Sequence, residues 1–224
     1  MRFEALATDY DGTLAHDGRI DAPTVAALER FRSAGRKLLL VTGRVLPELL
    51  QVCHRLDLFD LAVIENGAVL YWPDDRRTRV LAPPPPPSFA EELRRRGVEP
   101  LGTGEVIVAT FRPHLETVTA AVRETGLALE VILNKDAVMV LPRGVDKAFG
   151  LAAALAELGL TADRVVAVGD AENDFPFLKM CGFSVAVANA LPELQSAVDH
   201  VTRGHRGQGV AELIDLILSE TRPA

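Results

Sequence analysis

The sequence contains few cysteines, no excess of basic residues and no long apolar run, and each absence argues against a class of protein. Its two cysteines, Cys53 and Cys181, are far apart and match no metal-ligand spacing, so we expect packed thiols rather than a disulfide. A formal net charge of −7 argues against a general nucleic-acid binder, because such proteins carry a basic surface. No apolar stretch is long enough to cross a membrane, and the first residues lack the apolar segment of a secretory signal. The expected location is therefore the cytoplasm.

What the sequence does contain is an alternation of short apolar runs with helical patterns along much of its 224 residues. This alternation predicts a parallel sheet with helices on both faces, because a crossover helix joins each pair of parallel strands. The expected fold is α/β, with a Rossmann-like, doubly wound parallel sheet as its core. The expected strands are 3–8, 37–41, 61–64, 68–72, 164–168, 185–187 and 200–202. One helix is expected to start at about residue 21 and to stop at residue 35. Further helices are expected at 46–56, 147–158, 191–198 and 209–219.

The middle of the chain departs from this alternation. Residues 83–87 are five consecutive prolines, which cannot join the interior of a sheet and favour a stiff extended segment. We interpret this segment as an arm leading into an inserted α+β unit; a stiff surface loop is the other interpretation. The predicted organisation is a discontinuous core, residues 1–82 and 143–224, with a small cap inserted at 83–142. Within the cap, we expect helices at 89–95 and 115–125 and strands at 106–111, 129–133 and 137–141.

Polar clusters follow several of the predicted core strands. In an open parallel sheet, ligands bind outside the carboxyl ends of the strands, so these clusters are expected to meet at one edge. A further element, a lysine at the start of the helix after the cap, belongs to the same edge. The clusters are DYDGT at 9–13, TGR at 42–44 and GDAEND at 169–174, and the lysine is Lys147.

Asp9 and Asp11 are one residue apart at the end of a strand, where aspartate is uncommon. Two carboxylates so close together repel, unless a cation lies nearby, one of them keeps its proton, or the pair is solvated in a turn. Asp9, Asp170 and Asp174 could together supply the hard oxygen ligands that Mg²⁺ prefers. Aspartates are also common in solvated turns and helix caps, which is the ordinary explanation of each motif taken singly.

The remaining polar residues are suited to holding a phosphoryl group. Thr42 and the backbone amides near Gly43 could bind phosphate oxygens, and Lys147 could add a positive charge. Asp9 could then attack phosphorus to form an aspartyl-phosphate. Asp11 could protonate the leaving oxygen and afterwards accept a proton from the attacking water.

These motifs, in this order, resemble those of the haloacid dehalogenase-like (HAD) phosphohydrolases. The Glu-Asn-Gly-Ala turn at 65–68, the position of the cap and the Asn-Ala pair at 189–190 resemble the Cof-type subgroup with an α/β cap. The resemblance implies an enzyme with Mg²⁺ as its cofactor. It implies that Asp9 is the nucleophile, Asp11 the acid and base, and Asp9, Asp11, Asp170 and Asp174 the metal ligands, Asp11 through its backbone carbonyl and Asp174 directly or through water. The implied phosphate contacts are Thr42, its neighbour Gly43 and Lys147, and Asn173 lies beside them. For Arg44 two roles stay open, a contact with the substrate and an ion pair at the surface.

The expected function is Mg²⁺-dependent hydrolysis of a small phosphorylated metabolite of the phosphoglycolate or sugar-phosphate class. A phosphotransferase or phosphomutase of the phosphomannomutase type is the alternative, and a receiver-like phospho-accepting signalling module is a more distant one. In the cap, Arg112, His114 and Lys135 could reach the leaving group, although each is also typical of a protein surface. We expect neither a nucleic-acid nor a membrane partner, and the oligomeric state is left open.

Overall fold

A large, mainly parallel sheet forms the centre of the protein in the computed structural model, which describes residues 3–219. Residues 1–2 and 220–224, the two ends of the predicted core, lie outside the described residues. The strands run in the order β12-β11-β10-β1-β2-β3-β4-β5, parallel from β12 to β3 and antiparallel at β4 and β5. Their bounds are β1 (Ala5–Thr8), β2 (Lys37–Val41), β3 (Leu61–Ile64), β4 (Val69–Trp72), β5 (Arg77–Val80), β10 (Val165–Gly169), β11 (Phe183–Ala186) and β12 (His200–Val201).

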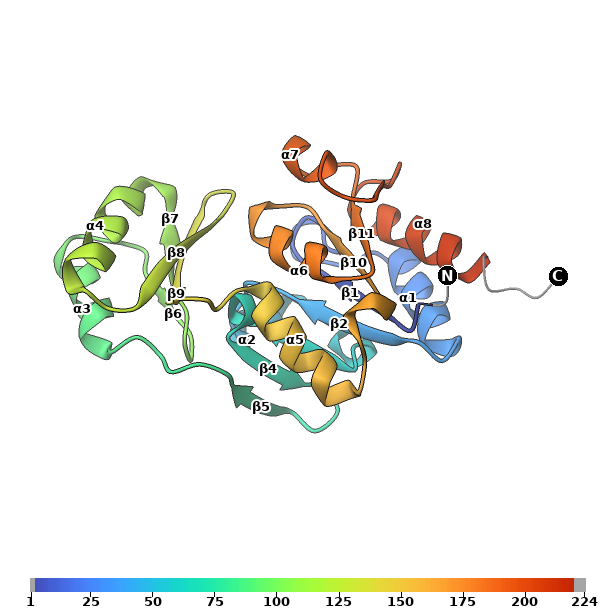
Figure 1. The fold of residues 1–224 in the computed structure, drawn as a ribbon, viewed down its shortest axis with the longest axis horizontal. Helices are drawn as coiled ribbons and strands as arrows, with labels where there is room; N and C mark the ends of the chain where they lie inside the picture. Colours follow the sequence, from blue (N-terminus) through green and yellow to red (C-terminus); the bar gives the residue numbers. More distant parts are fainter. Residues whose placement is uncertain (1–2, 220–224) are drawn as a thin grey trace.

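Helices cover both faces of this sheet (Figure 1). On one face α5 (Lys147–Leu158) packs beside α6 (Phe175–Met180), and on the other α1 (Ala22–Ser33) packs beside α8 (Arg206–Ser219). The central strands are buried along nearly their whole length, as expected for parallel strands that are covered on both faces. The predicted α/β fold with a doubly wound parallel sheet is confirmed. Within residues 3–219, no helix is long and apolar enough to cross a bilayer.

Some predicted boundaries are wrong. The helix expected at 46–56 is α2 (Leu46–Val52), followed by a short 3-10 turn, η1 (Leu56–Leu58), which buries the next two leucines of the apolar pattern. The helix expected at 191–198 is the four-residue α7 (Pro192–Gln195). Strand β5 was not predicted, because all four of its residues are exposed and two are arginines. Charged side chains of this kind protect the open edge of a sheet from pairing with another chain.

A second, antiparallel sheet lies beside the first, in the order β6-β7-β9-β8. Its strands are β6 (Gly102–Thr103), β7 (Val108–Phe111), β8 (Leu129–Asn134) and β9 (Ala137–Pro142). Helices α3 (Pro87–Arg95) and α4 (Leu115–Thr125) cover its outer face and share an apolar cluster with it that includes Phe89, Leu93, Val118 and Val138. Figure 1 shows this unit at one end of the molecule, joined to the large sheet by the segments before α3 and after β9.

The extended spacer formed by the proline run is shorter than predicted, because the last proline, Pro87, is already the first residue of α3. Proline is tolerated there, since the first helical N–H has no partner within the helix. The separate apolar cluster of the small sheet supports the predicted division into a core (1–82 and 143–224) and an inserted cap (83–142). This division stays a prediction, and the names core and cap are used below for these segments.

The turn between β3 and β4 brings the chain against the start of α5. Gly67 has φ +110°, and a Cβ at this position would lie 1.8 Å from the backbone oxygen of Asp146, the N-cap of α5. We expect Gly67→Ala to lower the free energy of unfolding by about 3 kcal/mol, because overpacking costs about 1–3 kcal/mol and a left-handed backbone about 1–2 kcal/mol. Gly126→Ala is the matched control, since Gly126 has φ +65° and no atom within 4 Å of its Cβ position. Equal losses in chemical denaturation would show that the contact with Asp146 does not constrain this turn.

Candidate active site

Three aspartates meet at the carboxyl ends of β1 and β10. Asp9 follows β1, Asp170 follows β10, and Asp174 ends the short 3-10 turn η5 (Glu172–Asp174). All three are buried, and one oxygen from each carboxylate lies within 4.8 Å of the other two. Strand β1 lies between β10 and β2, where the order of the strands reverses, and such reversal points are where ligands bind in open α/β sheets.

Lys147 neutralises part of this negative charge. It is the first residue of α5, whose N-cap is Asp146, and its side chain is fully buried. Its ammonium Nζ lies 2.5 Å from Asp9 Oδ1 and 2.6 Å from Asp174 Oδ1. Burial alone would lower the pKa of Lys147, but the two carboxylates outweigh it and raise that pKa above its ordinary value. The lysine therefore stays charged and holds the two carboxylates together.

Asp170 has two other partners. The Thr13 hydroxyl donates to its Oδ1 at 2.9 Å, and the Lys135 ammonium lies 2.5 Å from its Oδ2. Lys135 belongs to the cap, in the turn between β8 and β9. Burial and the neighbouring Asp174 raise the pKa of Asp170, and the contact with Lys135 opposes them. Burial likewise raises the pKa of Asp9 well above its ordinary range, against the effect of Lys147.

The aspartate cluster fits a divalent cation. Asp9, Asp170 and Asp174 offer hard oxygen donors, which are the ligands of Mg²⁺. The two ammonium groups that contact these carboxylates, those of Lys147 and Lys135, leave an excess of negative charge at the cluster. These three aspartates are the residues that could hold such an ion.

Asp11 points to a different partner. Its carboxylate accepts two hydrogen bonds from the Arg44 guanidinium, from Nε at 2.6 Å and from Nη2 at 2.8 Å. The Asp11 carboxylate is not part of the aspartate cluster, although Asp9 and Asp11 line the same cavity. Arg44, for which two roles were predicted, thus forms an ion pair at the rim of that cavity.

The predicted phosphate contacts Thr42, Gly43 and Asn173 lie in the segments that follow β2 and β10. Thr42 and Gly43 follow β2, and the Thr42 hydroxyl accepts a hydrogen bond from the Arg44 amide at 3.2 Å. The Asn173 amide group, in η5, donates to Asn66 Oδ1 at 2.8 Å. The sequence pattern identified Asn66 only as a turn residue. Both side chains are buried, and Asn66 Nδ2 and Asn173 Oδ1 have no hydrogen-bond partner among the described residues.

Glu65 links the core to the cap. Its carboxylate is buried and accepts three backbone hydrogen bonds from the segment between β6 and β7. The donors are the amides of Glu105 at 2.9 Å, Val106 at 2.8 Å and Ile107 at 3.0 Å. The sequence offered no signal for this contact, because it joins a side chain to a backbone about 40 residues away.

A cavity of about 650 Å³ lies between the core and the cap. The core contributes polar and charged residues, and the cap contributes the inner face of its sheet. The lining residues are Asp9, Asp11, Thr42, Gly43, Arg44 and Glu48 from the core and Pro100, Leu101, Gly102, Ala109, Thr110, Phe111, Asn134, Ala137 and Met139 from the cap. Asp9, the predicted nucleophile, and the residues at 42–44, the predicted phosphate contacts, therefore face a space large enough for a small metabolite.

The three cap residues that were considered as leaving-group contacts differ in position. Lys135 reaches the aspartate cluster through Asp170, as described above. Arg112 donates to the Lys135 backbone oxygen at 2.5 Å and lies 3.7 Å from the Glu172 carboxylate, so it ties the β8–β9 turn to the core. His114 contacts the backbone oxygen of Glu99 at 2.8 Å, within the cap itself.

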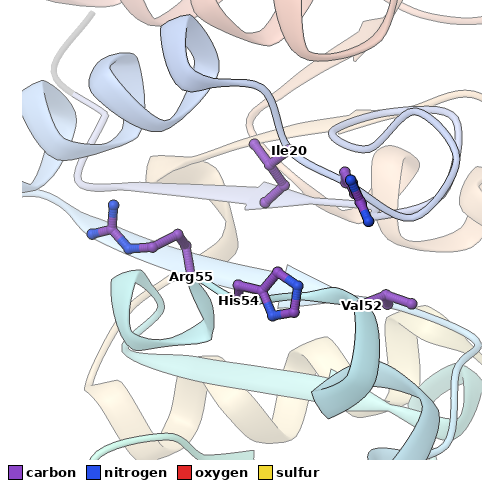
Figure 2. Close-up of a pocket in the computed structure, with 5 residues that line it drawn as sticks. Ile20, Val52, His54 and Arg55 are labelled. Carbon is purple, nitrogen blue, oxygen red and sulfur yellow. The ribbon is translucent and has the colours of Figure 1, made fainter.

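A smaller pocket of about 290 Å³ lies elsewhere on the core, lined by Arg19, Ile20, Val52, His54 and Arg55. Figure 2 draws these lining residues as sticks and labels all but Arg19, and it shows the guanidinium of Arg55 turned away from His54. Arg55 bonds to Glu29 at 2.9 Å and to Asp57 at 3.1 Å, so its charge is already paired. None of the predicted site residues lines this pocket.

Comparison with known proteins agrees with this geometry. A family model described as haloacid dehalogenase-like hydrolase matches residues 6–84 and 105–214 of the chain. The chain belongs to this family. The predicted HAD resemblance is confirmed, and so is the prediction of an enzyme, a phosphatase of the HAD superfamily.

Relatives of this HAD phosphatase include two archaeal proteins. It is 32% identical over 219 residues to the phosphoglycolate phosphatase of Methanothermobacter thermautotrophicus, covering 94% of this chain and 96% of the relative. It is 30% identical over 226 residues to phosphoglycolate phosphatase 2 of Saccharolobus solfataricus, covering 96% and 92%. Among solved structures, it superposes with Thermoplasma acidophilum 0175 at a TM-score of 0.83 and 18% identity, covering 97% and 99%. The last comparison concerns the fold alone.

Proposed function

We propose that this protein is a Mg²⁺-dependent phosphomonoester hydrolase that releases phosphate from a small phosphorylated metabolite. The observation that carries the proposal is the buried cluster of Asp9, Asp170, Asp174 and Lys147 at the point where the strand order reverses. Such a cluster combines a nucleophilic oxygen, ligands for a cation and a fixed positive charge. The cavity beside Asp9 provides room for the ester.

In the proposed first step, an oxygen of Asp9 attacks phosphorus and the bond from phosphorus to the leaving oxygen breaks. The product is an aspartyl-phosphate on Asp9, and the leaving oxygen takes a proton from Asp11. In the second step Asp11 accepts a proton from water, whose oxygen attacks phosphorus and releases phosphate from Asp9. Asp11 is paired with Arg44 in this structure, so its carboxyl has to leave Arg44 and bind a proton from solvent before the first step.

The other residues of the site would hold the phosphoryl group. Thr42, the amides near Gly43 and the Lys147 ammonium are the proposed phosphate contacts, with Asn173 beside them. Mg²⁺, held by Asp9, Asp170, Asp174 and the Asp11 backbone carbonyl, would supply Lewis-acid stabilisation of the charge that develops on the phosphoryl oxygens. Lys147 would also orient Asp9, because it already holds one of its oxygens.

The proposed substrate class is phosphoglycolate or a sugar phosphate. The proposed location of the enzyme is the cytoplasm. The relatives named as phosphoglycolate phosphatases match nearly the whole chain at 30–32% identity, which supports phosphoglycolate as the first substrate to test. The cavity volume of about 650 Å³ also suits a metabolite rather than a macromolecule.

The test is a phosphate-release assay on a panel of phosphorylated metabolites, with Mg²⁺ and with EDTA. We expect turnover of at least one ester with Mg²⁺ and a loss of about 100-fold or more with EDTA, because a bound cation stabilises the transition state by several kcal/mol. Turnover that is unaffected by EDTA would contradict the Mg²⁺ dependence. A strict requirement for a bisphosphate activator would instead support the phosphomutase alternative.

A further inference from the structure

The cap turns a mainly apolar face toward the cavity beside Asp9, with Thr110 and Asn134 as the polar residues of its lining. Side chains alternate along its strands, so Val108 and Val138 pack under α3 and α4 while their neighbours face the core. Four of these inward residues form two cross-strand pairs between β7 and β9, and all four line the cavity of about 650 Å³. The pairs are Ala109 with Met139 and Phe111 with Ala137; these four residues are called the cap wall.

The cap adds no charged side chain to the lining of this cavity within residues 3–219. The charged residues that line it, Asp9, Asp11, Arg44 and Glu48, all belong to the core. The one cation among them, Arg44, belongs to the core and is held by both oxygens of Asp11 until Asp11 takes up a proton. Lys135 does not line the cavity, and its ammonium contacts Asp170. A substrate group that lies against the cap would therefore meet no cation contributed by the cap lining.

Phe111 is the member of the cap wall that is most available for contact, whereas Met139 is buried against the core. Phe111 is 51% exposed, which is unusual for a large apolar residue that lines a cavity. Exposed apolar surface in a concave site is typical of ligand binding, because the ligand buries it. A carboxylate placed against this surface would lose its hydration without gaining a hydrogen-bond or ion-pair partner. Each methylene buried there would instead raise the affinity about fourfold.

We propose that the cap wall selects phosphomonoesters whose leaving group is uncharged and apolar. The selection rests on the proposed hydrolase function but revises its substrate class, because neither phosphoglycolate nor a sugar phosphate has an uncharged apolar leaving group. The phosphate would lie at the core and the leaving group against Ala109, Phe111, Ala137 and Met139. Phosphoglycolate, whose leaving group carries a carboxylate, is then a poorer substrate for this chain than an uncharged ester of the same length.

Ethyl, n-butyl and n-hexyl phosphate test the proposal, because their leaving oxygens are chemically alike and only the apolar length changes. We expect kcat/KM of the wild type to rise about fourfold per methylene until the cavity is filled. Phosphoglycolate has the same number of carbons as ethyl phosphate. We expect its kcat/KM to be about tenfold lower than that of ethyl phosphate, since an unpaired charged group is costly to bury. A flat alkyl series together with a preference for phosphoglycolate would overturn the proposal.

Two variants of the exposed Phe111 separate the cap wall from the chemistry. Phe111→Ser should flatten the dependence on alkyl length, so that kcat/KM falls more for n-hexyl phosphate than for ethyl phosphate. Phe111→Lys should shift the preference between phosphoglycolate and ethyl phosphate about tenfold toward phosphoglycolate, by supplying the missing cation. Leu216→Ser is the matched control, because Leu216 is an exposed apolar residue on α8 that lines no part of the cavity.

The outcomes of this experiment are distinguishable. Wild-type preferences that neither Phe111 variant changes would overturn the role of the cap wall, while phosphate release would still support the proposed function. Absence of phosphate release from every ester would overturn the proposed function and the selection with it.

Discussion

Asp9→Asn is expected to lower the rate of phosphate release by about 10⁴-fold or more. Removing the nucleophile from a group of cooperating catalytic residues lowers kcat by about this factor in other hydrolases. The amide nitrogen or oxygen of asparagine cannot replace the carboxylate as the group that attacks phosphorus. The size of the side chain stays the same, and Lys147 can still donate to the amide oxygen at the position of Asp9 Oδ1. The chemistry should therefore be lost while the surrounding structure is kept.

Thermal unfolding checks that the Asp9→Asn variant is folded. We expect an unfolding temperature equal to that of the wild type or above it, because one of three clustered negative charges has been removed. Asp215→Asn serves as the control, since Asp215 is an exposed carboxylate paired with Arg30 at 2.6 Å. If the Asp9→Asn enzyme keeps more than a small fraction of wild-type turnover, another group must be the nucleophile.

Lys147→Met is expected to lower both stability and activity. The ammonium is fully buried between Asp9 and Asp174, so its removal leaves two buried carboxylates without their cation. Breaking a buried ion pair from one side costs about 3–5 kcal/mol. In a protein of this size the unfolding temperature should fall by about 10 °C. Phosphate release should fall about 100-fold or more, because the same charge is proposed to orient Asp9 and to contact the phosphate.

Calorimetry with and without Mg²⁺ measures this effect. Because a cation bound only by the folded state stabilises it, we expect Mg²⁺ to restore more stability to Lys147→Met than to the wild type. Lys179→Met is the matched control, since Lys179 is an exposed lysine on α6. An unfolding temperature within about 2 °C of the wild type would mean that Lys147 does not hold the cluster together.

Much of the fold could be predicted from the sequence because the central strands are continuous apolar runs. LLLV at 38–41 and VVAV at 165–168 are entirely buried, and only a sheet covered on both faces buries such strands. The parallel arrangement then brings the residues after each strand to one edge. Asp9, Thr42 and Asp170 could be grouped for that reason, although the first and the last are 161 positions apart in the sequence.

What could not be predicted involves contacts that have no local pattern. Lys135 is an exposed residue of a turn, and its contact with Asp170 depends on how the cap is positioned over the core. Strands β5 and β6 lack an apolar run, so their pairing is set by the neighbouring strands. The cap wall is hidden from a single sequence for another reason: Ala109 and Phe111 follow the usual alternation of a strand, and their face becomes important only when it is seen opposite the core.

The contact made by Glu65 has a consequence for how such an enzyme can change. The Glu65 carboxylate of the core binds the cap through the backbone amides of residues 105–107, which every amino acid except proline provides. Of the side chains in that segment, Val106 and Ile107 are buried in the apolar cluster of the core, and only that of Glu105 is exposed. At the preceding Gly104, a Cβ would lie 2.4 Å from a Glu65 oxygen. The attachment of the cap therefore depends on few side chains, Glu65, Val106 and Ile107, so substitutions elsewhere in the cap can accumulate without breaking it.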